Sequence, residues 1–100
     1  MHAGHPFDIY HAMTITRQMV ADQISAHLRG QRKLAEIVSW AEAAMQEGEF
    51  DQADLTVIRD VVARLGLADV AAFGLTWEDA VELLSRLGYR ATVDIQSVRA

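Results

Sequence analysis

Apolar residues recur every three or four positions along most of the chain, which is the spacing of one buried helix face. Four segments show this spacing, at about residues 17–29, 31–47, 52–65 and 77–87. Residues suited to helix ends flank them. Thr16, Asp51 and Thr76 can cap N-termini, and Gly30 can end the first helix in a left-handed conformation. The pattern predicts a mainly α fold, a compact bundle of four main helices.

Two segments near the C-terminus depart from this spacing. Residues 67–73 lie between two glycines and are long enough for about two helical turns, so a short connecting helix is expected there. From Tyr89 to Gln96, apolar and polar residues alternate, which predicts a short C-terminal β-strand with one buried face.

A lone strand cannot satisfy its own backbone groups. The strand must therefore pair with residues 7–15, with the same strand of a second copy, or with the sheet edge of another protein. The start of the chain differs in composition from the rest. We expect residues 1–13 to form a flexible N-terminal extension and residues 14–100 to form a single domain.

Charge is unevenly distributed along the chain. The net charge is −5, but the stretch from Glu36 to Glu82 holds eleven acidic and two basic residues, a local balance of −9. Such a block disfavours direct nucleic-acid binding, because phosphates are bound by Lys and Arg. It favours a basic protein partner, through steering and complementarity. The alternative is an acidic surface that only keeps the protein soluble.

Composition and motifs narrow the chemistry. The chain has no Cys, which excludes disulfides and thiolate zinc sites and fits a reducing cytoplasm, the expected location. No apolar run approaches the roughly 20 residues of a membrane span. We find no nucleophile elbow and no glycine-rich phosphate loop, and His2, His5 and His11 match no dedicated metal site. The chain is therefore expected not to be an enzyme and to need no cofactor or metal.

Residues 62–87 read as helix, turn, short helix, turn and helix, which resembles a helix–turn–helix in outline. Its recognition helix would begin with Trp77, Glu78 and Asp79, and the two carboxylates repel phosphate. The simpler interpretation is a corner that packs three helices, with Phe73 and Trp77 in the core. A DNA-binding regulator remains an alternative, as does a homodimeric structural or adaptor protein joined through residues 89–96.

The leading hypothesis places the contact surface in the acidic middle of the chain. Trp77 serves there as an aromatic anchor, because an exposed aromatic flanked by acids is typical of a binding hot spot. The candidate partner-binding residues are Glu42, Glu47, Glu49, Asp51, Asp69, Trp77, Glu78, Asp79 and Glu82.

The stretch Gly66-Leu-Ala-Asp-Val-x-x-Phe-Gly-Leu-Thr-Trp-Glu-Asp and the ending Leu87-Gly-Tyr resemble a pattern in small bacterial proteins without assigned activity. In size, acidity and helical make-up the chain is similar to small bacterial or phage inhibitors of the anti-CRISPR, antitoxin or immunity type. This resemblance implies stoichiometric binding to a basic, nucleic-acid-handling protein or ribonucleoprotein complex. The resemblance assigns no role to any individual residue.

Overall fold

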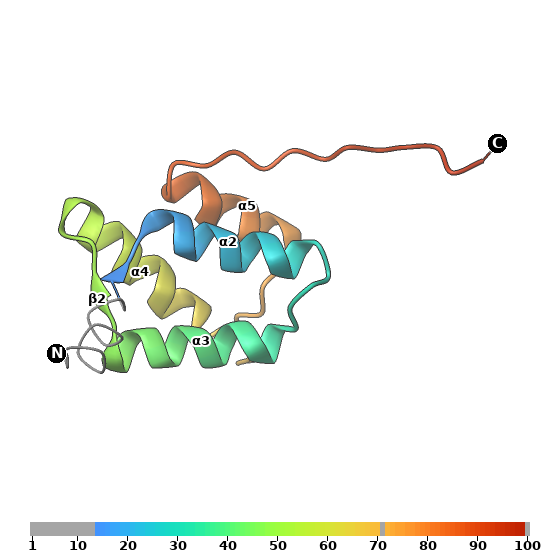
Figure 1. The fold of residues 1–100 in the computed structure, drawn as a ribbon. Helices are drawn as coiled ribbons and strands as arrows, with labels where there is room; N and C mark the ends of the chain where they lie inside the picture. The colour runs from blue at the N-terminus through green and yellow to red at the C-terminus, as the bar shows by residue number, and fades with distance from the viewer. Residues whose placement is uncertain (1–13, 71, 100) are drawn as a thin grey trace, which may run out of the picture.

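The computed structural model describes residues 14–70 and 72–99, and the predicted N-terminal extension, 1–13, lies outside them. The described part is mainly helical, as expected. Its helices are α2 (Arg17–Leu28), α3 (Leu34–Glu47), α4 (Leu55–Leu65) and α5 (Trp77–Arg86), with a 3₁₀ helix, η1 (Gln52–Asp54), directly before α4. Two short strands, β1 (Thr14–Ile15) and β2 (Glu49–Phe50), complete it (Figure 1). None of the described helices is long and apolar enough to cross a membrane.

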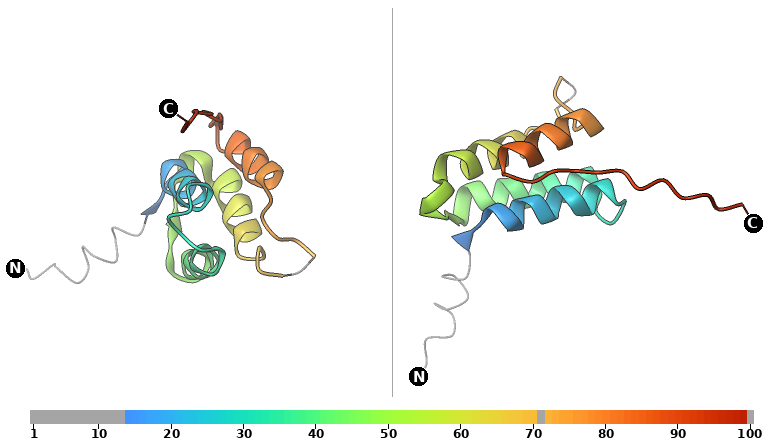
Figure 2. Two further views of the ribbon diagram at one scale, coloured as in Figure 1. Left: turned by 90° about the vertical axis from the view of Figure 1, so that its right-hand side faces the viewer. Right: turned by 90° about the horizontal axis from the view of Figure 1, so that it is seen from above.

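Helix α2 contacts all three other helices, and α3 packs mainly on α4 (Figures 1 and 2). The buried face of each helix follows the predicted apolar spacing. The fully buried large side chains are Ile15, Val20, Ile24, Ile37, Ile58, Val61, Val62, Leu65 and Leu87. Met45 also fits the apolar spacing of α3 but is 41% exposed, because the core side of that helix is filled by Ile37, Ala41 and Ala44.

The predicted helix starts are formed at two of the caps. The Thr16 hydroxyl accepts a hydrogen bond from the Met19 amide (3.2 Å). Thr76 and Asp79 form a reciprocal capping box, in which the Thr76 hydroxyl accepts from the Asp79 amide (3.1 Å) and the Asp79 carboxylate accepts from the Thr76 amide (2.9 Å). The cap at Thr16 and the box at Thr76 satisfy amides that have no partner inside the helix, and so fix where each helix begins.

Gly30 ends α2 in the left-handed region, at φ +76°, as expected. The amide of Gln31 then bonds back to the Ala26 carbonyl (2.8 Å). This return bond keeps Gln31 outside the next helix, so α3 begins at Leu34 rather than at residue 31.

Strands β1 and β2 pair in parallel, with Thr14 opposite Glu49 and Ile15 opposite Phe50. The sequence had offered residues 89–96 as the partner of residues 7–15. The actual partner is set by packing, because Ile15 is only 1% exposed and reaches the backbone at Gly48. A Cβ at Gly48 would lie 3.0 Å from Ile15 Cγ1, so glycine permits this close approach.

The predicted C-terminal strand is not confirmed. Residues 89–99 run extended along α5 and α2 and continue past both helices, without joining a sheet in the described chain (Figures 1 and 2). The short connecting helix is not formed either. The described residues between α4 and α5 form turns, because their amides mostly bond to carbonyls three residues back, such as Val70 to Leu67 and Phe73 to Val70.

Candidate partner-binding surface

The structure does not bring the nine candidate residues together. One group lies around β2 and comprises Glu47, Glu49 and Asp51. Another opens α5, which begins at the end of the helical body away from β2 (Figures 1 and 2). The members of this second group are Trp77, Glu78, Asp79 and Glu82. Glu42 is exposed on α3, and Asp69 is exposed between α4 and α5. The acidic block of the sequence is therefore not one continuous face.

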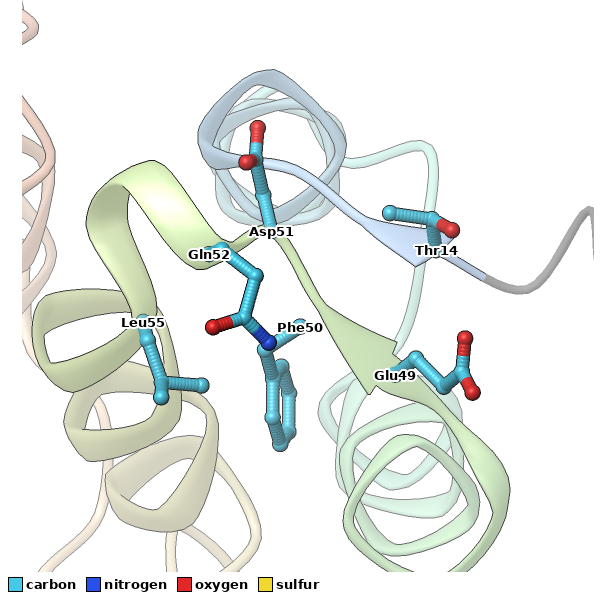
Figure 3. Close-up of a pocket in the computed structure, with 6 residues that line it drawn as sticks. All are labelled: Thr14, Glu49, Phe50, Asp51, Gln52 and Leu55. Atoms are coloured by element: carbon cyan, nitrogen blue, oxygen red, sulfur yellow. The ribbon is translucent and has the colours of Figure 1, made fainter.

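Two members of the β2 group, Glu49 and Asp51, line an open hollow of about 520 Å³, together with Thr14, Phe50, Gln52 and Leu55. Figure 3 shows the Glu49 and Asp51 carboxylates pointing away from each other. Asp51 is used locally, since its carboxylate accepts a hydrogen bond from the Ala53 amide (3.1 Å) at the start of η1. These two acids thus do not converge on a common ligand.

At the beginning of α5 the acids also divide into two kinds. Asp79 is committed to the capping box and forms an ion pair with Arg64 on α4, with 3.5 Å between Arg64 Nη2 and Asp79 Oδ2. Glu78 and Glu82 are exposed, and their carboxylates make no hydrogen bond or ion pair with another described residue. Glu78 and Glu82 are therefore the carboxylates of this group that can meet a partner without breaking a contact that holds the fold.

Hydrogen bonds lower the pKa of Asp79 below its ordinary value. The largest cause is the hydrogen bond from the Thr76 amide, followed by the hydrogen bond with the Thr76 hydroxyl. Desolvation opposes them, and the positive charge of Arg64 adds a weaker lowering effect. Asp79 is therefore ionised at neutral pH. Its role is to hold the first turn of α5, not to exchange protons.

Arg64 links three elements at this end of the molecule. Besides pairing with Asp79, its guanidinium carbon lies 5.3 Å from the centre of the Phe73 ring, within the range of a cation–π contact. The end of α4, the connection and the first turn of α5 are thereby held in one arrangement. Sequence reasoning missed Arg64 because this contact depends on how α4 and α5 approach each other.

Between α4 and α5, three large apolar side chains are left in solvent: Leu67 and Val70, each 45% exposed, and Phe73, 47% exposed. We call these three residues the apolar loop. Their three-residue spacing, with bonds between successive members, resembles a 3₁₀ turn, in which such side chains share one side. The connection that carries them projects from the helical body (Figure 2). The acidic side chain within it, Asp69, is also exposed.

The expectation that Phe73 and Trp77 lie in the core was wrong. Phe73 rests on Arg64, and Trp77 is 43% exposed. Trp77 lines a hollow between α2, α5 and residues 91–94, so it faces α2 whereas Phe73 faces α4. Trp40, in contrast, is partly buried against the core. The core is filled by aliphatic residues, and the two aromatics beside the connection lie at the surface.

Within residues 14–70 and 72–99 there is no group of three His, Asp or Glu side chains that could hold a metal ion. His27 has a structural contact, since its Nδ1 lies 3.0 Å from the Arg32 carbonyl oxygen across the α2–α3 turn. The other histidines lie outside the described residues.

Comparison with family models, with curated proteins and with solved structures gave no match for this chain.

Proposed function

We propose that the protein is a non-enzymatic regulator or inhibitor that binds a basic protein surface through the connection between α4 and α5. The observation that carries this proposal is the apolar loop. Three large apolar side chains, each close to half exposed, occupy successive turns of a projecting connection. Clusters of this kind mark protein-binding sites more often than isolated exposed residues do.

The surroundings of the apolar loop favour a basic partner. Asp69 lies between Leu67 and Val70 in the chain, and the exposed Glu78 follows at the start of α5. An apolar centre with charged residues at its rim is the usual layout of a binding surface, where burial supplies affinity and rim charges supply steering and specificity. A nucleic-acid-handling protein or ribonucleoprotein complex presents surface of the required positive sign.

The contact is also pre-organised. Arg64 fixes Phe73 against α4 and ties α5 to the same point, so fewer side chains lose freedom when a partner docks. Phe73 is therefore the residue we expect to contribute most to affinity. Trp77 contributes less in this arrangement, because it faces α2 from the other side of the first turn of α5.

The experiment compares proteins retained from a host extract by immobilised wild-type chain and by two pairs of variants. Phe73→Ala is matched with Met45→Ala, which removes a similarly exposed apolar side chain from α3. Glu78→Lys is matched with Asp22→Lys, which makes the same charge change at an exposed position on α2. A specific partner should be lost with Phe73→Ala and Glu78→Lys and kept with both controls.

Salt provides a second criterion. Retention should weaken between low and high ionic strength, because rim charges are screened within about 8 Å at physiological salt. A partner that binds Phe73→Ala as well as wild type would contradict the proposal. So would retardation of random duplex DNA by the chain alone in a low-salt gel shift, which would favour direct DNA binding through residues 62–87.

A further inference from the structure

The segment that follows α5 starts from a fixed position. Gly88, at φ +91°, lets the Tyr89 amide bond back to the Leu84 carbonyl (2.8 Å), which is the C-terminal turn that orients the outgoing chain. Arg17 supports the same turn. It donates a hydrogen bond to the Leu87 carbonyl (2.9 Å), and its guanidinium carbon lies 5.7 Å from the Tyr89 ring centre. We call residues 89–96 the tail.

Beyond its first three residues, the tail is exposed. Tyr89 and Ala91 pack on the core, but Val93 is 64% exposed and Ile95 is 89% exposed. No backbone hydrogen bond joins residues 90–96 to another described residue. The tail therefore presents an apolar face of alternate side chains and unpaired backbone groups along its edges, which are the two features of a strand that lacks its neighbour.

We propose that two copies of this chain dimerise by pairing their tails antiparallel, with Thr92 opposite Thr92 of the second copy. In an antiparallel pair, residues that oppose each other point to the same face, so the register must match apolar with apolar positions. With Thr92 at the centre, Ala91 opposes Val93 and Tyr89 opposes Ile95. On the other face, Arg90 opposes Asp94, and symmetry makes this ion pair twice.

Several registers would place the apolar residues of both copies on the same face, and charge favours the one centred on Thr92. A pair centred on Asp94 would set two carboxylates directly opposite each other, and one centred on Arg90 would do the same with two guanidiniums. Like charges in opposing positions destabilise a strand pair. Of the registers that preserve the apolar face, the one centred on Thr92 brings Arg90 and Asp94 together.

The body of the protein has space for the incoming side chains. Beside the tail lies an open hollow of about 340 Å³, lined by Val81, Ser85, Gly88, Tyr89, Arg90 and Ala91. In the proposed register, Val93 and Ile95 of the second copy lie next to Ala91 and Tyr89, on the face that these two residues turn toward the body. The side chains left in solvent by one copy would then be covered by the other.

The dimer does not depend on the apolar loop, so either proposal can fail without the other. The first test uses the absence of Cys from the chain. Thr92→Cys places one thiol opposite itself in the dimer, whereas the matched control Ser97→Cys places it beyond the paired region. Under mild oxidation, Thr92→Cys should form a covalent dimer at least several times faster than Ser97→Cys. Equal rates would overturn the register.

The second test exchanges the charges. Light scattering on the full chain should find a dimer whose dissociation constant rises about tenfold in Asp94→Arg or Arg90→Asp, since each single change creates two like-charged pairs. The double variant Arg90→Asp with Asp94→Arg should return to near the wild-type value. A strict monomer at high micromolar concentration would overturn the dimer, and failure of the double variant to recover would overturn the pairing of these two residues.

Discussion

Replacing Gly88 by Ala tests how the end of α5 is built. Gly88 lies at φ +91°, where an L residue costs about 1 kcal/mol more than glycine. A Cβ at this position would also lie 2.6 Å from Arg17 Nη1, the nitrogen that donates to the Leu87 carbonyl. The guanidinium must therefore move, and its hydrogen bond, worth about 1 kcal/mol, is lost. The expected loss in the free energy of unfolding is about 2 kcal/mol.

The chain supplies two matched glycines as controls. Gly30 ends α2 with the same pattern of return bonds and a φ of +76°, but a Cβ there would meet nothing within 4 Å. Gly30→Ala should therefore cost only the backbone part, about 1 kcal/mol. Gly66 has an ordinary helical φ of −65° and room for a methyl group. Gly66→Ala should therefore stabilise the fold by about 0.5 kcal/mol, because alanine lowers the conformational entropy of the unfolded chain.

The assay is urea unfolding followed by far-ultraviolet circular dichroism at a single protein concentration, with the slope on denaturant checked for constancy. The three variants should rank with Gly88→Ala least stable, Gly30→Ala next and Gly66→Ala above wild type. If Gly88→Ala cost no more than Gly30→Ala, the Arg17 contact would contribute nothing, and the account of how α5 ends would be refuted.

Other variants probe the remaining contacts by the same unfolding measurement. Ile15→Ala should cost about 3 kcal/mol, because Ile15 is 1% exposed and holds β1 on the core; a cost below 1 kcal/mol would contradict that burial. Trp40→Ala should cost about 2 kcal/mol and Trp77→Ala clearly less, and a reversed order would show the exposures to be wrong. Thr76→Ala should cost about 1 kcal/mol through the lost cap. Because the pKa of Asp79 is lower in the folded than in the unfolded chain, its ionised carboxylate stabilises the fold at pH values above the unfolded-state pKa. This contribution is lost as pH falls from about 4 through the folded-state pKa. Asp79→Asn should therefore make the free energy of unfolding depend less on pH in that range.

The helices were predictable because their signals are local. Apolar spacing and end residues such as Thr16, Gly30 and Thr76 act within one or two turns, and each forms the predicted cap or stop. The pairing of β1 with β2 was not predictable in this way. It depends on the contact of Ile15 with Gly48, two residues brought together only after α2 and α3 have packed.

The candidate site likewise depends on how distant segments pack, which the sequence pattern did not predict. Clustering of acids along the sequence suggested one acidic face, but most of those acids lie around β2 or at the start of α5, which are at different ends of the body. Residues 67–73 were expected to form a short connecting helix because their length suits about two helical turns, and Phe73 was expected in the core. Two glycines close together, Gly66 and Gly74, were the available sign that this short segment forms turns instead.

The position of α5 in the packing also sets an order of folding. Helices α3 and α4 are consecutive in the sequence, so their contact closes a short loop. Helix α5 packs on α2, which is the first helix of the domain and is distant from it in the sequence. Joining distant segments carries the larger entropic cost and is deferred until the nearer contacts exist. Helix α5 should therefore dock last and open first, and its amides should exchange with solvent through a smaller opening free energy than those of α3 and α4.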